Sequence, residues 1–312
     1  MSKTQNKKLP LIMLPIGMIV AGVITGLIST VMSIVTPIII QELWFSVDPI
    51  VYSVVNNVAS LIGSLSYIIV IVLFSLVCKG FQKKLCFIMS AYVGSISYIL
   101  LSGVILVTSI LLSIIPINDY TIQTLILSGG NIIGGFLGII VEVLVAIFFF
   151  KYLSSFTEKE PDEEDEPYKV NLLKPCIVVV GYGVLSLIGG FVASAISTAA
   201  NQSALMLKNA YGQIAITQAT SIVTSVVLWA VLIGATFLFK DKYQKLTIVG
   251  SVIVGKNIWG FVGILFNFIT MFFPEISGVV NFFSTGITTV LGIATGILLF
   301  YIANKKQYER IK

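Results

Sequence analysis

Residues 134–150 read GGFLGIIVEVLVAIFFF, an apolar run in which Glu142 is the only charged side chain. A helix needs about 20 such residues to cross the hydrocarbon core of a bilayer, and apolar residues continue beyond both ends of this run. Hydrophobic residues make up 57% of the 312-residue chain and charged residues 11%. A soluble domain cannot bury that much apolar surface, so the sequence predicts an integral membrane protein.

Eight apolar runs of this kind lie between charged or proline-containing breaks, at 12–38, 50–77, 85–114, 121–150, 173–199, 212–239, 246–273 and 278–303. The runs are continuous and do not alternate apolar with polar residues, which favours helices over the strands of a membrane barrel. We therefore predict an all-α, polytopic protein with about eight transmembrane helices.

Basic residues indicate how these helices are oriented. They occupy the two chain ends, the segments after the second and sixth runs, and the flanks of the central linker: Lys3, Lys7, Lys8, Lys79, Lys83, Lys84, Lys151, Lys159, Lys169, Lys174, Lys240, Lys242, Lys245, Lys305, Lys306, Arg310 and Lys312. With eight crossings all of these segments fall on one side, and basic loops stay in the cytoplasm. We expect both termini to be cytoplasmic; if the source is prokaryotic, the membrane is the plasma membrane. The net charge of +5 then requires no nucleic-acid partner.

The chain also contains an internal similarity. Residues 78–98, CKGFQKKLCFIMSAYVGSISY, align with residues 239–259, FKDKYQKLTIVGSVIVGKNIW, with lysines, a serine and a glycine in register. The alignment divides the protein into a four-span repeat at 1–156, a linker at 157–170 and a second four-span repeat at 171–312. Because four is even, the repeats enter the membrane in the same direction, related by an axis along the bilayer normal.

The linker is strongly acidic, with the sequence TEKEPDEEDEPY from Thr157 to Tyr168. Carboxylates this close together repel one another and bury nothing, so we expect a solvated connection. A docking site for a basic cytosolic protein is the alternative. The bilayer itself is the one partner that the composition requires.

Two charges lie deep inside the apolar runs. Glu142 precedes Lys151 by nine residues, and Lys256 follows Lys245 by eleven. At about 1.5 Å per residue both are about 14–16 Å from the basic end, near the midplane. Equal depth and opposite sign suggest an ion pair across the interface between the repeats. A solute or proton pathway and a lysine that snorkels toward the surface are the alternatives.

Small and polar side chains recur at helical spacing in several runs. Glycines suited to close helix packing are Gly22, Gly26, Gly130, Gly134, Gly138, Gly292 and Gly296. A polar stripe is formed by Ser53, Asn57, Ser60 and Ser64, with Asn267 on the face that carries Lys256. Another stripe, which includes Gly183 and Ser186, lies in the fifth run. Such stripes join membrane helices more often than they line a cavity.

Enzyme chemistry has no support in the sequence. The chain has no histidine, and it contains no phosphate-binding loop, no dinucleotide fingerprint after a strand and no metal-binding motif. The three cysteines, Cys78, Cys86 and Cys176, lie near the basic ends of their runs and are expected to be reduced. We expect no cofactor, no metal and no catalytic residue.

Each repeat has a span that ends in Lys79-Gly80 or Lys240-Asp241 and leads into a short turn, followed in the first repeat by Ala91-Tyr92-Val93-Gly94-Ser95-Ile96. This pattern resembles the Yip/Yif-type integral membrane proteins over about three spans per repeat. The resemblance implies a helical membrane domain with a role in trafficking, here in tandem duplicate, and assigns no functional residue.

Two functions follow from these observations. A non-enzymatic membrane scaffold or partner-binding protein, as the resemblance implies, predicts that Glu142 and Lys256 touch directly with no cavity beside them. A permease for a small solute or an ion, with its site near the midplane at the repeat interface, predicts a polar cavity that reaches one face.

Overall fold

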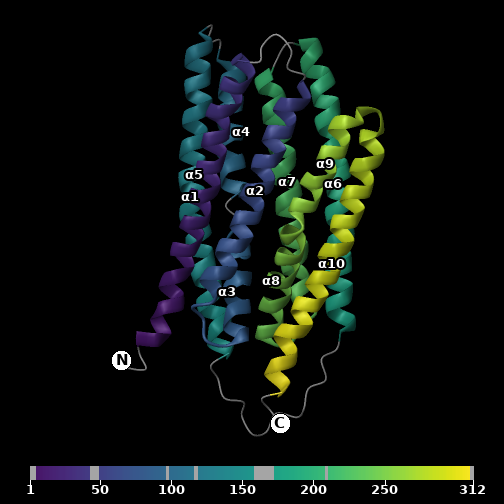
Figure 1. Cartoon of the computed structure of the whole chain (residues 1–312). Helices are drawn as coiled ribbons and strands as arrows, with labels where there is room; N and C mark the ends of the chain where they lie inside the picture. Colours follow the sequence, from purple (N-terminus) through teal and green to yellow (C-terminus); the bar gives the residue numbers. More distant parts are fainter. Residues whose placement is uncertain are drawn as a thin grey trace.

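The computed structural model describes residues 5–42, 49–95, 98–115, 119–157, 172–207 and 210–309. These residues are almost entirely α-helical, and the described ranges contain no strand. In chain order the helices are α1 (Gln5–Glu42), α2 (Pro49–Ser75), α3 (Phe81–Gly94), α4 (Tyr98–Ile114), α5 (Tyr120–Thr157), α6 (Leu173–Leu207), α7 (Ala210–Thr236), α8 (Lys242–Ile258), α9 (Gly260–Phe272), the 3-10 helix η2 (Pro274–Ile276) and α10 (Ser277–Glu309). The helices run roughly along one common direction (Figure 1). The acidic linker lies outside the described residues, except for Thr157.

The predicted polytopic helical architecture is confirmed. Eight segments of the described chain are long and apolar enough to cross a membrane. Many large apolar side chains face outward, among them Phe136, Phe148 and Phe237, each at least 66% exposed. Outward-facing aromatic and aliphatic side chains are what lipid contact requires, because the bilayer is itself apolar.

The third and seventh apolar runs differ from the continuous helices expected at 85–114 and 246–273. The first is divided into α3 and α4, and the second into α8 and α9. At the end of α3 the Ser95 hydroxyl donates to the Tyr92 carbonyl at 2.6 Å. In the last turn of α8 the Asn257 side-chain amide donates to the Ile253 carbonyl at 2.8 Å. Such side chains compete for the carbonyls of the backbone ladder and permit a break in the helix.

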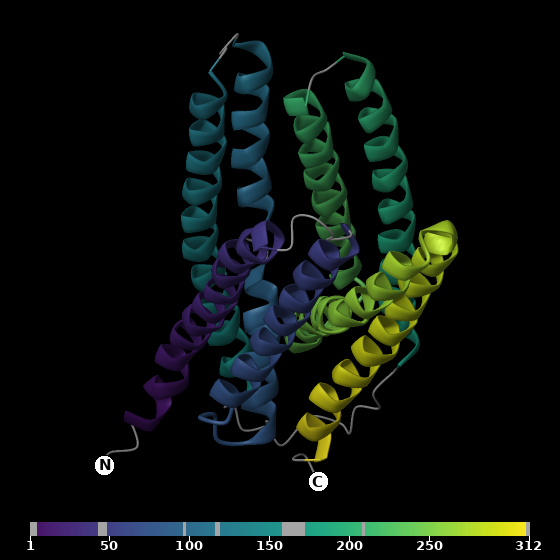
Figure 2. The same ribbon diagram turned by 45° about the horizontal axis from the view of Figure 1, so that its top comes forward.

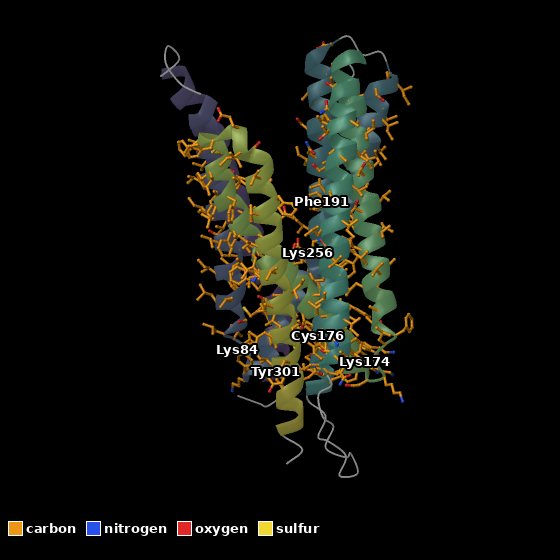
Figure 3. All side chains as sticks on the ribbon, turned by 90° about the vertical axis from the view of Figure 1, so that its right-hand side faces the viewer. Lys84, Lys174, Cys176, Phe191, Lys256 and Tyr301 are labelled. Atoms are coloured by element: carbon orange, nitrogen blue, oxygen red, sulfur yellow. The ribbon has the colours of Figure 1, made fainter. Side chains whose placement is uncertain are left out.

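The helices form two groups of four. In one, α1 packs on α2, α2 on α9 and α9 on α10; in the other, α5 packs on α4, α4 on α7 and α7 on α6. The short helices α3 and α8 pack on each other between the groups. Figure 2 shows the two groups as separate sets of ribbons. They lie together at the end that carries Lys84 and Lys174 and diverge toward the opposite end (Figure 3).

The buried core is concentrated around α3 and α8. It includes Phe87 and Met89 of α3, Ile248 and Val254 of α8, and Phe300 of α10, none more than 2% exposed. Large side chains from both halves of the chain meet there, so this contact ties the two groups together. Burying each such side chain stabilises the fold by about 1.5–3 kcal/mol relative to water, although in lipid the gain comes mostly from close packing.

The start of α1, the end of α10 and the turns after α2 and α7 all lie at one end of the bundle (Figure 1). This agrees with an even number of crossings and gathers the basic segments at one end. Cys78, in the turn between α2 and α3, also belongs to this end and is 1% exposed. Burial raises the pKa of the Cys78 thiol to about 11, against the opposing effect of Lys83 and Lys84.

Cysteine labelling can test which side this end faces. Cys176 is partly accessible near the start of α6, whereas Cys78 is buried. In opened membranes at pH 7.5 a membrane-impermeant maleimide is expected to label Cys176 and to spare Cys78, whose reactive thiolate is scarce until the pH nears about 11. In intact cells neither is expected to react, because the distribution of lysines predicts that this end faces the cytoplasm. A Cys176→Ser variant provides the control. Labelling of Cys176 in intact cells would show that the basic end faces outward, opposite to the predicted orientation.

Candidate functional site: a cavity at the break between α8 and α9

Lys256 lies in the last turn of α8, two residues before the helix ends. The helix begins at Lys242, where the Asp241 carboxylate accepts a hydrogen bond from the Tyr243 amide at 3.2 Å. At about 1.5 Å per residue, Lys256 is about 21 Å along the helix, well inside a bilayer core about 30 Å thick. Figure 3 shows it at mid-height, far from Lys84 and Lys174.

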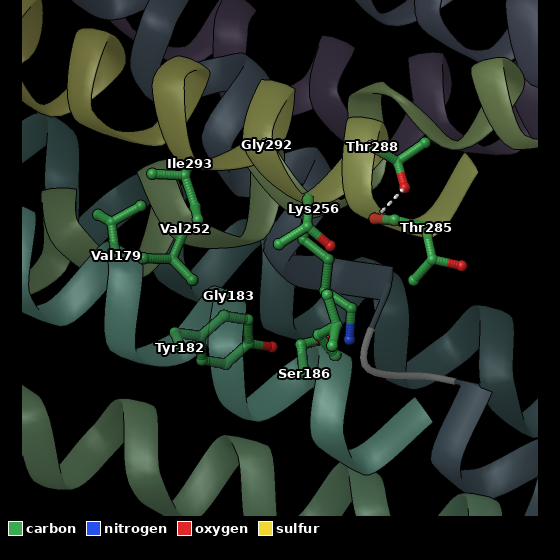
Figure 4. Close-up of a pocket in the computed structure, with 12 residues that line it drawn as sticks. Val179, Tyr182, Gly183, Ser186, Val252, Lys256, Thr285, Thr288, Gly292 and Ile293 are labelled. Atoms are coloured by element: carbon green, nitrogen blue, oxygen red, sulfur yellow. Dashed lines mark hydrogen bonds between the residues drawn. The ribbon is translucent and has the colours of Figure 1, made fainter. Parts of the chain in front are cut away.

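Beside Lys256 is a cavity of about 190 Å³ between α6, α8 and α10. It lies between the two groups of helices, since α6 belongs to one and α10 to the other. Its lining residues are Val179, Tyr182, Gly183, Ser186 and Leu187 of α6, Val252 and Lys256 of α8, and Thr285, Thr288, Thr289, Gly292 and Ile293 of α10 (Figure 4). Aliphatic and hydroxyl-bearing side chains thus share the walls with one amine.

The Lys256 amine is held by no carboxylate among the described residues. Its Nζ lies 5.7 Å from the centroid of the Tyr182 ring, a cation–π contact. Its side chain stays accessible, whereas Tyr182 is only 6% exposed. A charged lysine inside a bilayer costs about 2.5–3.5 kcal/mol on insertion scales, so an accessible one beside a cavity is a candidate functional residue.

The hydroxyl groups of the cavity differ in what they can donate. Thr288 Oγ1 donates to the carbonyls of Ser284 at 2.9 Å and Thr285 at 3.1 Å (Figure 4). Thr285 Oγ1 donates to the Asn281 carbonyl at 2.8 Å. These hydrogens are engaged within α10. The Tyr182 and Ser186 hydroxyls have no such partner in the described structure, and Figure 4 shows the Tyr182 hydroxyl and the Lys256 amine directed into the same space.

Glu142 does not pair with Lys256, contrary to the expectation from their equal depth. Its carboxylate accepts a hydrogen bond from the Tyr67 hydroxyl at 3.4 Å. Tyr67 also makes an edge-on contact with Tyr92, with ring centroids 5.8 Å apart. Depth along a helix does not determine which neighbour a side chain faces. Here α5 packs mainly on α3 and α4, whereas α8 packs mainly on α10 and α3.

The glycines singled out in the sequence fall into two sets. A methyl group added at Gly130 would lie 2.6 Å from Thr108 Cγ2, and one at Gly134 would lie 2.9 Å from Leu101 Cδ1, both on α4. Gly138, which like Gly130 and Gly134 belongs to α5, is buried. On α10, Gly292 and Gly296 pack against the α8 backbone. Gly22 and Gly26 differ, since a methyl group there would meet no atom within 4 Å.

The polar stripe on α2 does not reach the cavity. The Asn57 amide donates to Met271 Sδ of α9 at 3.4 Å, so this face is part of the α2–α9 contact. Ser60 is exposed, Ser64 is half-buried and Asn267 is exposed. The Ser53 side chain lies outside the described residues. None of Asn57, Ser60, Ser64 and Asn267 lines the cavity beside Lys256.

Several cavity residues were not anticipated from the sequence. Thr285, Thr288 and Thr289 share one helical face with Gly292, which was predicted only as a packing residue, and could have been recognised as a second stripe opposite Gly183 and Ser186. Tyr182 precedes that stripe and carried no sequence signal of its own. Comparisons of the chain with protein-family models, with curated proteins and with solved structures found no match.

Proposed function

We propose that this protein is a permease for a small solute, with its binding site at Lys256. The observation that carries the proposal is the cavity beside an accessible lysine inside a membrane-crossing segment. A scaffold would bury its charges in direct contact and leave no such space. Here Glu142 and Lys256 have separate tyrosine partners, and one of them borders a cavity.

The broken helices support the same conclusion. α3–α4 and α8–α9 are interrupted at corresponding positions of the two halves, next to Gly94 and Lys256. Paired interruptions near the midplane are typical of carrier binding sites, because the freed backbone groups must be satisfied by protein, water or substrate. Lys256, in the turn that precedes the second interruption, lines the cavity.

The two halves have the packing expected of parallel repeats. The helix order in each half is long, long, short, short, long. The fourth helix of each half packs on the second helix of the other half: α4 packs on α7, and α9 packs on α2. The third helices of the two halves, α3 and α8, pack on each other. These contacts are mutual, as a twofold axis along the bilayer normal requires. We therefore retain the division into repeats at 1–156 and 171–312, with both termini in the cytoplasm.

This arrangement offers a route for alternating access. The two groups of helices touch closely at the basic end and diverge at the other, with the cavity between α6 of one group and α10 of the other (Figure 3). Rocking of the groups about the α3–α8 contact would expose the site to the two faces in turn. The structure, in which the groups are apart at the end opposite the basic residues, corresponds to one of these states.

Uptake by proteoliposomes tests the proposal. Purified protein is reconstituted and offered a panel of radiolabelled neutral, anionic and cationic solutes, with protein-free liposomes as the baseline. At least one solute is expected to enter faster with the protein. Replacing Ser186 with tryptophan fills the cavity and is expected to reduce that uptake to a tenth or less. Ser194→Trp, on the same helix but not in the cavity lining, is the matched control.

Two results would refute the permease. If no solute of the panel enters faster than in protein-free liposomes, the scaffold remains as the better function. If Ser186→Trp and Ser194→Trp reduce uptake equally while both proteins stay monodisperse, transport does not use this cavity.

A further inference from the structure

We infer that the solute is a small organic anion with a single negative charge, whose charged group binds Lys256 and whose apolar part packs on the opposite wall. The inference rests on the proposed permease function and names the class of substrate for the same cavity. It is supported by the charge of the lining residues, the hydrogen-bond donors that border the cavity and the volume of the cavity.

The charge of the lining residues determines the sign of the charge that a bound solute should carry. Among the described residues that line the cavity, Lys256 is the one ionisable at neutral pH, and none is a carboxylate. A cation would meet an uncompensated like charge in a region of low dielectric, whereas one negative charge would neutralise the amine. A dianion would leave a net charge in the membrane, so a single charge is favoured.

The available donors suit an oxyanion. The Tyr182 side chain is 6% exposed, and its hydroxyl points into the cavity toward the Lys256 amine (Figure 4). This hydroxyl donates to no other group of the described protein, so it is available to a solute in the cavity. The Ser186 hydroxyl lies one turn further along α6. The Lys256 ammonium and the Tyr182 and Ser186 hydroxyls are three donor groups that can bind a carboxylate, which accepts several hydrogen bonds.

Size and wall chemistry limit the rest of the molecule. Val179, Val252 and Ile293 form an aliphatic wall. An engineered cavity of about 150 Å³ with apolar walls binds benzene, so about 190 Å³ has room for one such ring and a carboxyl group. Benzoate and short branched carboxylates are suitable probes. The phosphate of an anionic lipid presents similar chemistry, but the walls match a compact solute, and we assign the site to a soluble carboxylate.

Equilibrium dialysis of purified protein in neutral detergent tests this inference separately from transport. Radiolabelled benzoate is expected to bind at one site per chain. Benzamide, which has the same shape without the charge, is expected to bind at least tenfold more weakly, and benzylamine not to compete. Lys256→Met is expected to lose at least tenfold in benzoate affinity and Lys256→Arg to retain most of it. Lys245→Met, on the same helix, should bind as the unchanged protein does.

Other results would overturn the inference. Failure of both benzoate and isobutyrate to bind would exclude a carboxylate site. Binding of benzamide as tight as that of benzoate, or unchanged binding of benzoate by monodisperse Lys256→Met protein, would exclude it as well. Competition by phosphatidylglycerol micelles but not by isobutyrate would assign the site to a lipid. Uptake of neutral or cationic solutes alone would preserve the permease and refute this substrate class, whereas no uptake of any solute would refute both.

Discussion

Uptake of benzoate into proteoliposomes is expected to fall at least tenfold when Lys256 is replaced by methionine. Methionine retains an unbranched apolar side chain of similar length and removes the charge. An ion pair at about 4 Å and an effective dielectric constant of about 20 is worth about 4 kcal/mol. A tenfold loss needs only about 1.4 kcal/mol of this. The measurement is the initial rate of uptake at equal amounts of reconstituted protein.

Lys245→Met is the matched control for this experiment. Lys245 lies on the same helix and also contacts an aromatic ring, with its Nζ 5.6 Å from the centroid of Phe237. It lies near the start of α8 and does not line the cavity. Uptake by this variant should stay within about twofold of the unchanged protein. Equal losses in the two variants would mean that the lysines act through the fold, and unchanged uptake by Lys256→Met would exclude the proposed binding site.

Replacing Gly255 with alanine is expected to destabilise the folded protein by about 1–3 kcal/mol, the usual cost of overpacking. A methyl group at this position would collide with the carbonyl oxygen of Gly292 and would lie 3.0 Å from the amide nitrogen of Gly296. Both are backbone atoms of α10, which cannot rotate away as a side chain could. The α8–α10 crossing would have to open, and the wall of the cavity with it. Thermal loss of monodisperse protein in detergent is the readout.

Gly286→Ala serves as the comparison, because a methyl group there meets no atom within 4 Å. In a helix interior alanine is favoured over glycine by about 1 kcal/mol, so this variant should be as stable as the original or more so. Gly94→Ala is expected to resemble Gly255→Ala, since its methyl group would lie 2.7 Å from the Glu142 carbonyl oxygen. If Gly255→Ala proved as stable as Gly286→Ala, the close approach of α8 and α10 would be incorrect.

The two charged residues show how far sequence reasoning extends into the site. Their depth and their unusual character were evident from the spacing to Lys151 and Lys245. Their partners were not, because residues at the same height on different helices can face any of several neighbours. Glu142 contacts Tyr67 and Lys256 contacts Tyr182, and each tyrosine comes from a helix distant in the sequence from the charge that it contacts.

The sequence by itself determined the solvent, the number of crossings and the side on which the lysines gather. These properties depend on the length and composition of single segments, and a segment about 20 residues long either can or cannot satisfy its backbone in lipid alone. The tertiary structure decided where α3–α4 and α8–α9 break, which glycines touch another helix and that a cavity lies beside Lys256. Those properties depend on the rotation and approach of helices about one another, which no single segment encodes.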